Sequence, residues 1–228
     1  MRKILLTRLV ADNDEDKRYF EQLGYQCIEQ PLLELSLHQA ASTSLQAMEQ
    51  AEWLFLTSQH SAAFFLQLFL AQYSFSFLQK KKFAVIGEKT AVVLEKAGLY
   101  PNFQSRSATK RGLFTEWLAS YKEPTTIFYP KSSLADSRWE EAFSVQGHHF
   151  QTGIVYDNRF SENQKSALQQ LLNDSTIDAV YFTSLSLWQR FYAVYSQINA
   201  KTELKFYCVG QTTQEVIQKS GYHAVIKK

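Results

Sequence analysis

The sequence predicts an α/β protein in which helices connect the strands of parallel sheets. Short apolar runs rich in β-branched and aromatic residues alternate with stretches of helical period, and this plan occurs twice along the 228 residues. Alternation of this kind is typical of βαβ units with right-handed crossovers. A chain of this length fits one large domain or two smaller ones, and the duplication favours two.

Three pairs of segments carry the duplication. Residues 51–65 (AEWLFLTSQHSAAFF) align with 177–191 (IDAVYFTSLSLWQRF), each with an apolar run, a Thr-Ser pair and an amphipathic stretch. Residues 81–100 align with 204–223, each with an apolar run, a glycine and a threonine three positions later. KILLTR and TIFYPK form the third pair, since each has a glycine eighteen positions after its last apolar or aromatic residue. The repeat therefore covers nearly the whole chain.

Three glycines mark expected helix ends. Gly24, Gly98 and Gly221 each follow a stretch of helical period. Glycine is favoured just after a helix because it adopts the left-handed conformation without steric cost. The sequence therefore predicts that a helix ends immediately before each of them.

Six strand-end loops are the candidate binding sites, because ligands of open parallel sheets lie beyond the carboxyl ends of the strands. Their candidate residues are Thr7 and Arg8; Thr57 and Ser58; Gly87, Lys89 and Thr90; Lys131, Ser132 and Ser133; Thr183 and Ser184; and Gly210, Gln211, Thr212 and Thr213. Each loop precedes a helix, whose free N–H groups and dipole favour carboxylate or phosphate. Plain N-capping remains an alternative for any one loop. Six loops in corresponding places favour a ligand with many anionic groups.

Composition and motifs exclude several classes. With 24 basic and 22 acidic residues, no net field indicates a nucleic-acid partner. The sequence has no GxGxxG, GxxxxGK[ST], GxSxG or HExxH motif. The apolar run Ile4–Leu6 is too short for a signal peptide or a membrane span, so we expect a soluble, cytoplasmic protein without a membrane partner.

Isolated reactive residues have structural interpretations. Cys27 and Cys208 lie in apolar runs and are expected to be buried. His148 and His149 are adjacent, which predicts a surface turn rather than a shared metal site. The acidic residues of 12–16 suit the first turn of a helix. A phospho-receiver site would also need an aspartate at a central strand end, where this chain has Thr-Ser.

Six segments occur in a characteristic order. They are LFLTSQHSAAFF, FAVIGEKTAVVLEKAG, IFYPKSSLADSRWEEAF, GIVYDN, AVYFTSLSLWQRF and YCVGQTTQEVIQKSG. In this order they resemble the uroporphyrinogen-III synthase family over essentially the full length. The chain departs from the family where it often has Pro, at Leu9, and where it often has Asn-Gly or Pro-Ser, at residues 59–60 and 185–186.

The resemblance implies two flavodoxin-like domains with parallel sheets, joined by a two-stranded linker. QPLLELSL (30–37) and TGIVYDNR (152–159) suit the two crossings. Domain 1 would then be discontinuous, residues 1–33 plus 160–228, and domain 2 would span 38–151. Residues 34–37 and 152–159 would be the linker strands.

The resemblance also implies an activity in tetrapyrrole (heme) biosynthesis. The substrate would be hydroxymethylbilane, a linear tetrapyrrole with eight carboxylates, cyclised to uroporphyrinogen III with inversion of ring D and loss of water. No metal or cofactor is expected, and the protein is expected to be monomeric. By position the family's catalytic tyrosine is Tyr156. A non-enzymatic two-lobed binding module for an anionic small ligand remains the alternative, because architecture alone does not separate the two.

Overall fold

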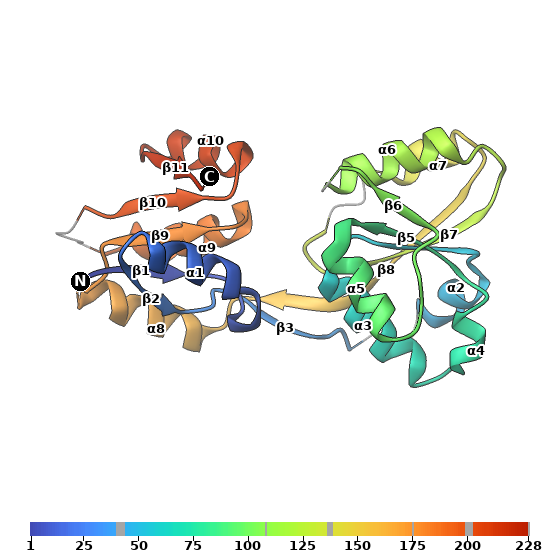
Figure 1. Ribbon diagram of the computed structural model, residues 1–228, viewed down its shortest axis with the longest axis horizontal. Helices are drawn as coiled ribbons and strands as arrows, with labels where there is room; N and C mark the ends of the chain where they lie inside the picture. Colours follow the sequence, from blue (N-terminus) through green and yellow to red (C-terminus); the bar gives the residue numbers. More distant parts are fainter. Residues whose placement is uncertain (40–43, 108, 136–138, 175, 199–202, 228) are drawn as a thin grey trace. The chain divides into compact units, whose positions relative to one another are not determined.

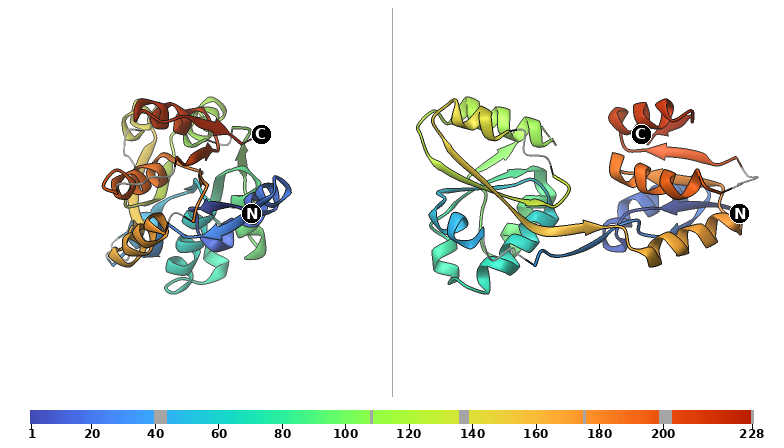
Figure 2. Two further views of the ribbon diagram at one scale, coloured as in Figure 1. Left: turned by 90° about the vertical axis from the view of Figure 1, so that its left-hand side faces the viewer. Right: turned by 180° about the vertical axis from the view of Figure 1, so that it is seen from behind.

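The computed structural model describes residues 1–39, 44–107, 109–135, 139–174, 176–198 and 203–227 (Figure 1). The chain forms two compact units, one of Met1–Glu34 with Arg159–Lys228 and the other of Leu35–Asn158. It leaves the first unit once and returns once, as can be followed in Figure 1 and Figure 2. The segments expected as linkers lie in strands β3 (Glu34–Leu37) and β8 (His149–Arg159), which are neighbours in one sheet.

The first unit holds a five-stranded sheet in the order β11-β10-β9-β1-β2, and each neighbouring pair is parallel. Its elements are β1 (Arg2–Leu6), η1 (Val10–Asp12), α1 (Asp14–Gln22), β2 (Tyr25–Glu29), α8 (Glu162–Asn173), β9 (Ala179–Phe182), α9 (Leu185–Tyr195), β10 (Lys205–Cys208), α10 (Gln211–Lys219) and β11 (Ala224–Ile226). Ile4 and Leu6 pack with α1, and Leu5 between them packs with α8, α9 and α10. Because both faces are covered there, residues 4–6 of β1 form an unbroken apolar run.

The second unit holds a six-stranded sheet in the order β3-β8-β7-β4-β5-β6. Its other elements are α2 (Leu45–Gln50), β4 (Trp53–Leu56), α3 (Gln59–Leu70), α4 (Phe75–Leu78), β5 (Lys82–Ile86), α5 (Gly87–Lys96), β6 (Phe103–Ser105), α6 (Lys110–Ser120), β7 (Thr126–Ser132) and α7 (Glu140–Ser144). One face packs in a cluster that includes Leu54 and Phe65 and involves α2 to α5, here called the α3 cluster. The other face packs in a cluster that includes Phe55 and Phe114, here called the α6 cluster.

The duplication in the sequence accounts for the topology. Strands β7, β8, β4, β5 and β6 are the repeat equivalents of β1, β2, β9, β10 and β11, and they follow one another in the same order across the sheet. Only the chain order differs, because the first unit starts with β1 and β2 whereas the second ends with β7 and β8. Numbered by position, both sheets have the flavodoxin-like order 2-1-3-4-5. The predicted α/β class with parallel sheets is confirmed.

The predicted glycine stops are also confirmed. Gly24, Gly98 and Gly221 have φ of 79°, 76° and 89°, the left-handed region in which a side chain would be strained. At the end of α10, the Gly221 N–H donates to Gln218 and the Tyr222 N–H donates to Ile217. This pair of bonds is the Schellman motif, which satisfies carbonyl groups left open at a helix end.

Two expectations about isolated residues need correction. His148 is not on a surface turn: it directly precedes β8, is 3 % exposed, and its ring packs against Trp117 of α6. Cys208 is buried as predicted, whereas Cys27 is only half-buried because β2 is an edge strand. In the described part of the chain, no helix has the length and apolar character needed to span a membrane.

Candidate functional site

The candidate loops gather at the carboxyl edge of each sheet. In the first unit, Thr7 and Arg8 follow β1, Thr183 and Ser184 follow β9, and residues 210–213 follow β10. These three strands are adjacent, in the order β10-β9-β1 (Figure 1). Parallel strands end at the same edge, so the three loops lie side by side.

The second unit repeats this arrangement. Thr57 and Ser58 follow β4, residues 87–90 follow β5, and residues 131–133 lie at the end of β7. Strands β7, β4 and β5 are again adjacent. Each unit therefore presents three neighbouring loops of the predicted kind.

Two of the serines act as helix caps. The Ser58 hydroxyl accepts the Ser61 N–H at 3.0 Å, and the Ser61 hydroxyl accepts the Ser58 N–H at 3.1 Å, which forms a capping box at the start of α3. The Ser184 hydroxyl accepts the Leu187 N–H at 3.4 Å at the start of α9. A cap of this kind satisfies one or two of the four N–H groups at a helix start, so capping and anion binding are compatible.

Several candidate threonines point inward. The Thr7 hydroxyl donates to the Tyr181 carbonyl at 2.7 Å and is 1 % exposed, which ties β1 to β9. Thr90 and Thr213 are 3 % and 5 % exposed. These buried side chains stabilise the loops and present no hydroxyl to solvent. The exposed candidates are Lys89, Ser133, Gln211 and Thr212.

The Arg8 guanidinium lies in an ion-pair network. It is 3.2 Å from the Asp16 carboxylate and 3.8 Å from Asp12. Asp16 is 4 % exposed and also accepts from the Lys227 ammonium at 2.6 Å. Burial raises the pKa of the neighbouring Tyr181 hydroxyl, and the Asp16 charge adds to this effect. Sequence reasoning missed this role of Asp16 and Lys227, because the two residues are 211 positions apart.

Tyr156 lies near the end of β8, in the second unit. Its ring is stacked on Phe64 of α3, with the ring centroids 5.0 Å apart and the planes inclined by 9°. Its carbonyl accepts the Ser133 N–H at 3.0 Å, and the residue pairs with Ser132 across the sheet. The structure thus brings Tyr156 together with the candidate loop 131–133. Phe64 had no signal in the sequence beyond its place in an amphipathic stretch.

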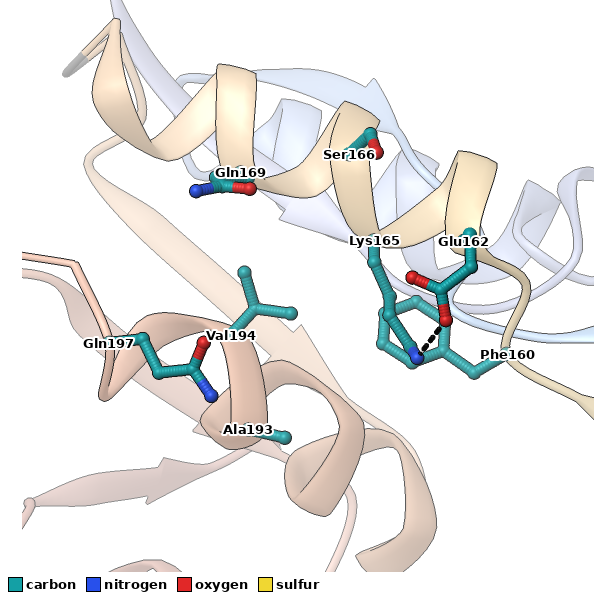
Figure 3. A pocket seen from close by; sticks show the side chains of 8 residues that line it. All are labelled: Phe160, Glu162, Lys165, Ser166, Gln169, Ala193, Val194 and Gln197. Carbon is teal, nitrogen blue, oxygen red and sulfur yellow. Dashed lines mark hydrogen bonds and ion pairs between the residues drawn. The ribbon is translucent and has the colours of Figure 1, made fainter.

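A pocket of about 380 Å³ opens on the helical surface of the first unit (Figure 3). Its lining comes from α8, the end of α9 and the residues that flank them: Phe160, Glu162, Lys165, Ser166, Gln169, Ala193, Val194 and Gln197. None of the candidate residues lines it, and the Lys165 ammonium is paired with the Glu162 carboxylate at 2.5 Å. This pocket is therefore distinct from the strand-end loops.

Possible metal ligands do not cluster in the described ranges. There, no three His, Cys, Asp or Glu side chains come together as possible ligands. The candidate loops instead offer hydroxyls, backbone N–H groups and a few cations, which suit carboxylate or phosphate.

Two flavodoxin-like units with hydroxyl-rich helix starts at both carboxyl edges define a two-unit α/β protein whose strand-end loops have the chemistry that suits anions. Comparison with known families makes the assignment specific. Residues 14–228 match the family described as uroporphyrinogen-III synthase HemD. The chain belongs to this family, whose activity is the lyase EC 4.2.1.75 of tetrapyrrole biosynthesis and which implies hydroxymethylbilane as substrate. The predicted family and enzyme class are confirmed.

Solved structures support the fold. A mutant uroporphyrinogen III synthase from the extremely thermophilic bacterium Thermus thermophilus is similar with a TM-score of 0.66 and 16 % identity, covering 100 % of this chain and 93 % of that one. The uroporphyrinogen-III synthetase of Helicobacter pylori 26695 is similar with a TM-score of 0.63 and 18 % identity, over the same shares. No curated protein matches.

Proposed function

We propose that this member of the family holds the carboxylates of hydroxymethylbilane at its strand-end loops and uses Tyr156 to assist departure of the terminal hydroxyl. The observation that carries the proposal is the pair of three-loop edges, each built from neighbouring strands of one sheet. Helix starts bind anions through backbone N–H groups and the helix dipole. A polycarboxylate ligand can use several such places at once.

The chemistry requires little covalent participation from the protein. Loss of hydroxide leaves an azafulvenium cation, which the substituted carbon of ring D attacks to give a spiro intermediate. Its fragmentation and reclosure invert ring D. The pyrrole carbon that closes the ring loses its proton as aromaticity returns, and this proton balances the one that leaves with hydroxide as water. The protein selects the attacking carbon by holding the chain in one conformation, and orientation of this kind contributes strongly to rate.

Tyr156 is proposed as the group that helps the hydroxyl leave. A phenol O–H can donate a hydrogen bond to a departing oxygen. Support comes from its place beside loop 131–133 and from the stacked ring, which keeps the phenol in one orientation. A tyrosine that only packs its ring is the alternative, and substitution by phenylalanine separates the two.

The experiment supplies enzymatically made hydroxymethylbilane and measures isomer III against the isomer I that forms spontaneously. We expect wild type to form isomer III, and Tyr156→Phe to be slower by about 10²-fold with little change in melting temperature. Retention of more than half of the wild-type rate by Tyr156→Phe would leave this residue as packing.

We further propose a monomer that acts in the cytoplasm. The support is that the hydrophobic clusters of each unit are formed by its own helices and strands, together with the family resemblance. Sedimentation of the purified chain tests the first point, and cell fractionation tests the second.

A further inference from the structure

A β-bulge in β8 immediately precedes Tyr156. Along β7 and β8, Lys131 pairs with Ile154, but the next residue, Ser132, pairs with Tyr156. Val155 is therefore an extra residue on β8. Bulges of this kind bend a strand and change the direction of the side chains that follow.

The bulge changes the face on which Tyr156 lies. Successive side chains of a regular strand point to opposite faces, so Tyr156 would share a face with Phe150, six positions earlier. Phe150 packs with the α6 cluster, whereas Tyr156 belongs to the α3 cluster together with its neighbour Val155. If β8 paired regularly through residue 156, with Val155 opposite Ser132 and no bulge, alternation would point Tyr156 to the α6 face.

Hydrogen bonds to both neighbouring segments stabilise this irregular backbone. The Val155 carbonyl accepts the His38 N–H at 3.0 Å, and the Tyr156 carbonyl accepts the Ser133 N–H at 3.0 Å. The carbonyls of the extra residue and of Tyr156 are thus both satisfied, which fixes the local register.

Phe64 packs against the ring of Tyr156, the residue that follows the bulge. It lies in the second turn of α3, is half-buried against the α3 cluster, and stacks on Tyr156 with planes inclined by 9°. A ring face opposite the phenol restricts rotation about the side-chain bonds of Tyr156. We propose that the bulge at Val155 and the ring of Phe64 together form a positioning device for the Tyr156 phenol, with Phe64 as a positioning residue. This inference rests on the proposed role of Tyr156.

The test is a double-mutant cycle on formation of isomer III. We expect Phe64→Leu to lower kcat by about 3- to 10-fold, with KM changed less than about twofold, because loss of one stacked pair loosens the phenol without touching the loops. In the Tyr156→Phe background the same change should alter kcat by less than about twofold, since no phenol remains to be positioned. Phe64→Tyr keeps a ring and should restore most of the rate.

Phe77→Leu is the matched control. Phe77 is also half-buried against the α3 cluster, and it stacks on Phe69 with centroids 5.8 Å apart. It has no ring contact with Tyr156 among the described residues. We expect Phe77→Leu to lower the melting temperature about as much as Phe64→Leu while keeping kcat.

The positioning role of Phe64 and the proposed role of Tyr156 can fail separately in these measurements. Equal losses of kcat from Phe64→Leu in the wild-type and Tyr156→Phe backgrounds would overturn the positioning role while leaving Tyr156 in place. Equal losses from Phe64→Leu and Phe77→Leu would do the same, because they would reduce the effect to stability. Full activity of Tyr156→Phe would remove the proposed role of Tyr156 and the inference with it.

Discussion

Replacing Asp16 tests the ion-pair network at the carboxyl edge of the first unit. Asp16 is 4 % exposed and lies within 3.2 Å of the Arg8 guanidinium and 2.6 Å of the Lys227 ammonium. Asp16→Asn keeps the shape but leaves both cations without their shared carboxylate. Breaking a fully buried pair costs about 3–5 kcal/mol. The Arg8 and Lys227 side chains are 26 % and 15 % exposed, so water offsets part of this, and we expect a loss of about 2–3 kcal/mol.

Thermal unfolding measures the loss. For a chain of this size about 1 kcal/mol shifts Tm by 2–4 °C, so Asp16→Asn should lower Tm by roughly 4–12 °C. Glu162→Gln is the control, because it breaks the Lys165–Glu162 pair, whose side chains are 42 % and 84 % exposed. An exposed pair is worth about 0–1 kcal/mol, so this variant should melt close to wild type. If both variants shifted Tm equally, the buried network would contribute nothing beyond surface charge.

Three further predictions concern other sites. Burial lowers the pKa of His148 more than the Tyr121 backbone raises it, and nearby Lys122 lowers it further, so folding disfavours protonation of this ring. The contribution of His148 to the free energy of unfolding should therefore be fully present above its unfolded-state pKa of about 6.5 and should fall as pH drops below that value. Urea-unfolding midpoints measured against pH should show this fall in the wild type and a smaller one in His148→Leu. Gly153→Ala would place a Cβ 2.8 Å from the buried Phe128 ring and 2.2 Å from the Ser44 hydroxyl, so it should cost about 1–3 kcal/mol in chemical denaturation. Thr57→Ala, Thr183→Ala and Thr212→Ala should each lower the rate of isomer III formation only a few-fold, about 0.5–1.5 kcal/mol apiece. The reason is that backbone N–H groups are proposed to hold the carboxylates. The proposal would be contradicted if Lys89→Ala or Lys131→Ala abolished substrate binding while the three threonine variants kept the wild-type rate.

The sequence was sufficient for the fold because the signals there are local and duplicated. Apolar runs such as Ile4–Leu6 indicate strands buried on both faces, and Gly24 and Gly221 indicate helix ends through a conformation that glycine favours. The duplication also predicted which strands are equivalent. The duplication alone does not indicate that the second unit ends with the pair that begins the first; the linker strands implied by the family resemblance, at 34–37 and 152–159, indicated that order.

The strand-end loops were predicted as positions, but the direction of their side chains was not. Thr7 and Thr212 both belong to hydroxyl-rich loops, yet Thr7 is buried against the Tyr181 carbonyl and Thr212 is exposed. Direction depends on register relative to the neighbouring strand, which composition does not reveal. The partnership of Asp16 with Lys227 was equally inaccessible, because no local pattern joins residues at opposite ends of the chain.

The surroundings of Tyr156 differ from those that its sequence segment predicts, because β8 contains one extra residue. The segment 152–159 suggests a regular alternating strand, and strict alternation would place Tyr156 on the face that carries Phe150. The family resemblance identified the residue, whereas its packing against Phe64 follows from the bulge at Val155, which has no partner in the β7 register. A register shift of one residue moves every following side chain of a strand to the opposite face. The face on which Tyr156 lies therefore depends on how β8 pairs with its neighbours β7 and β3. In the proposed positioning of Tyr156, His38 and Ser133 also contribute, because their N–H groups donate to the Val155 and Tyr156 carbonyls at the bulge.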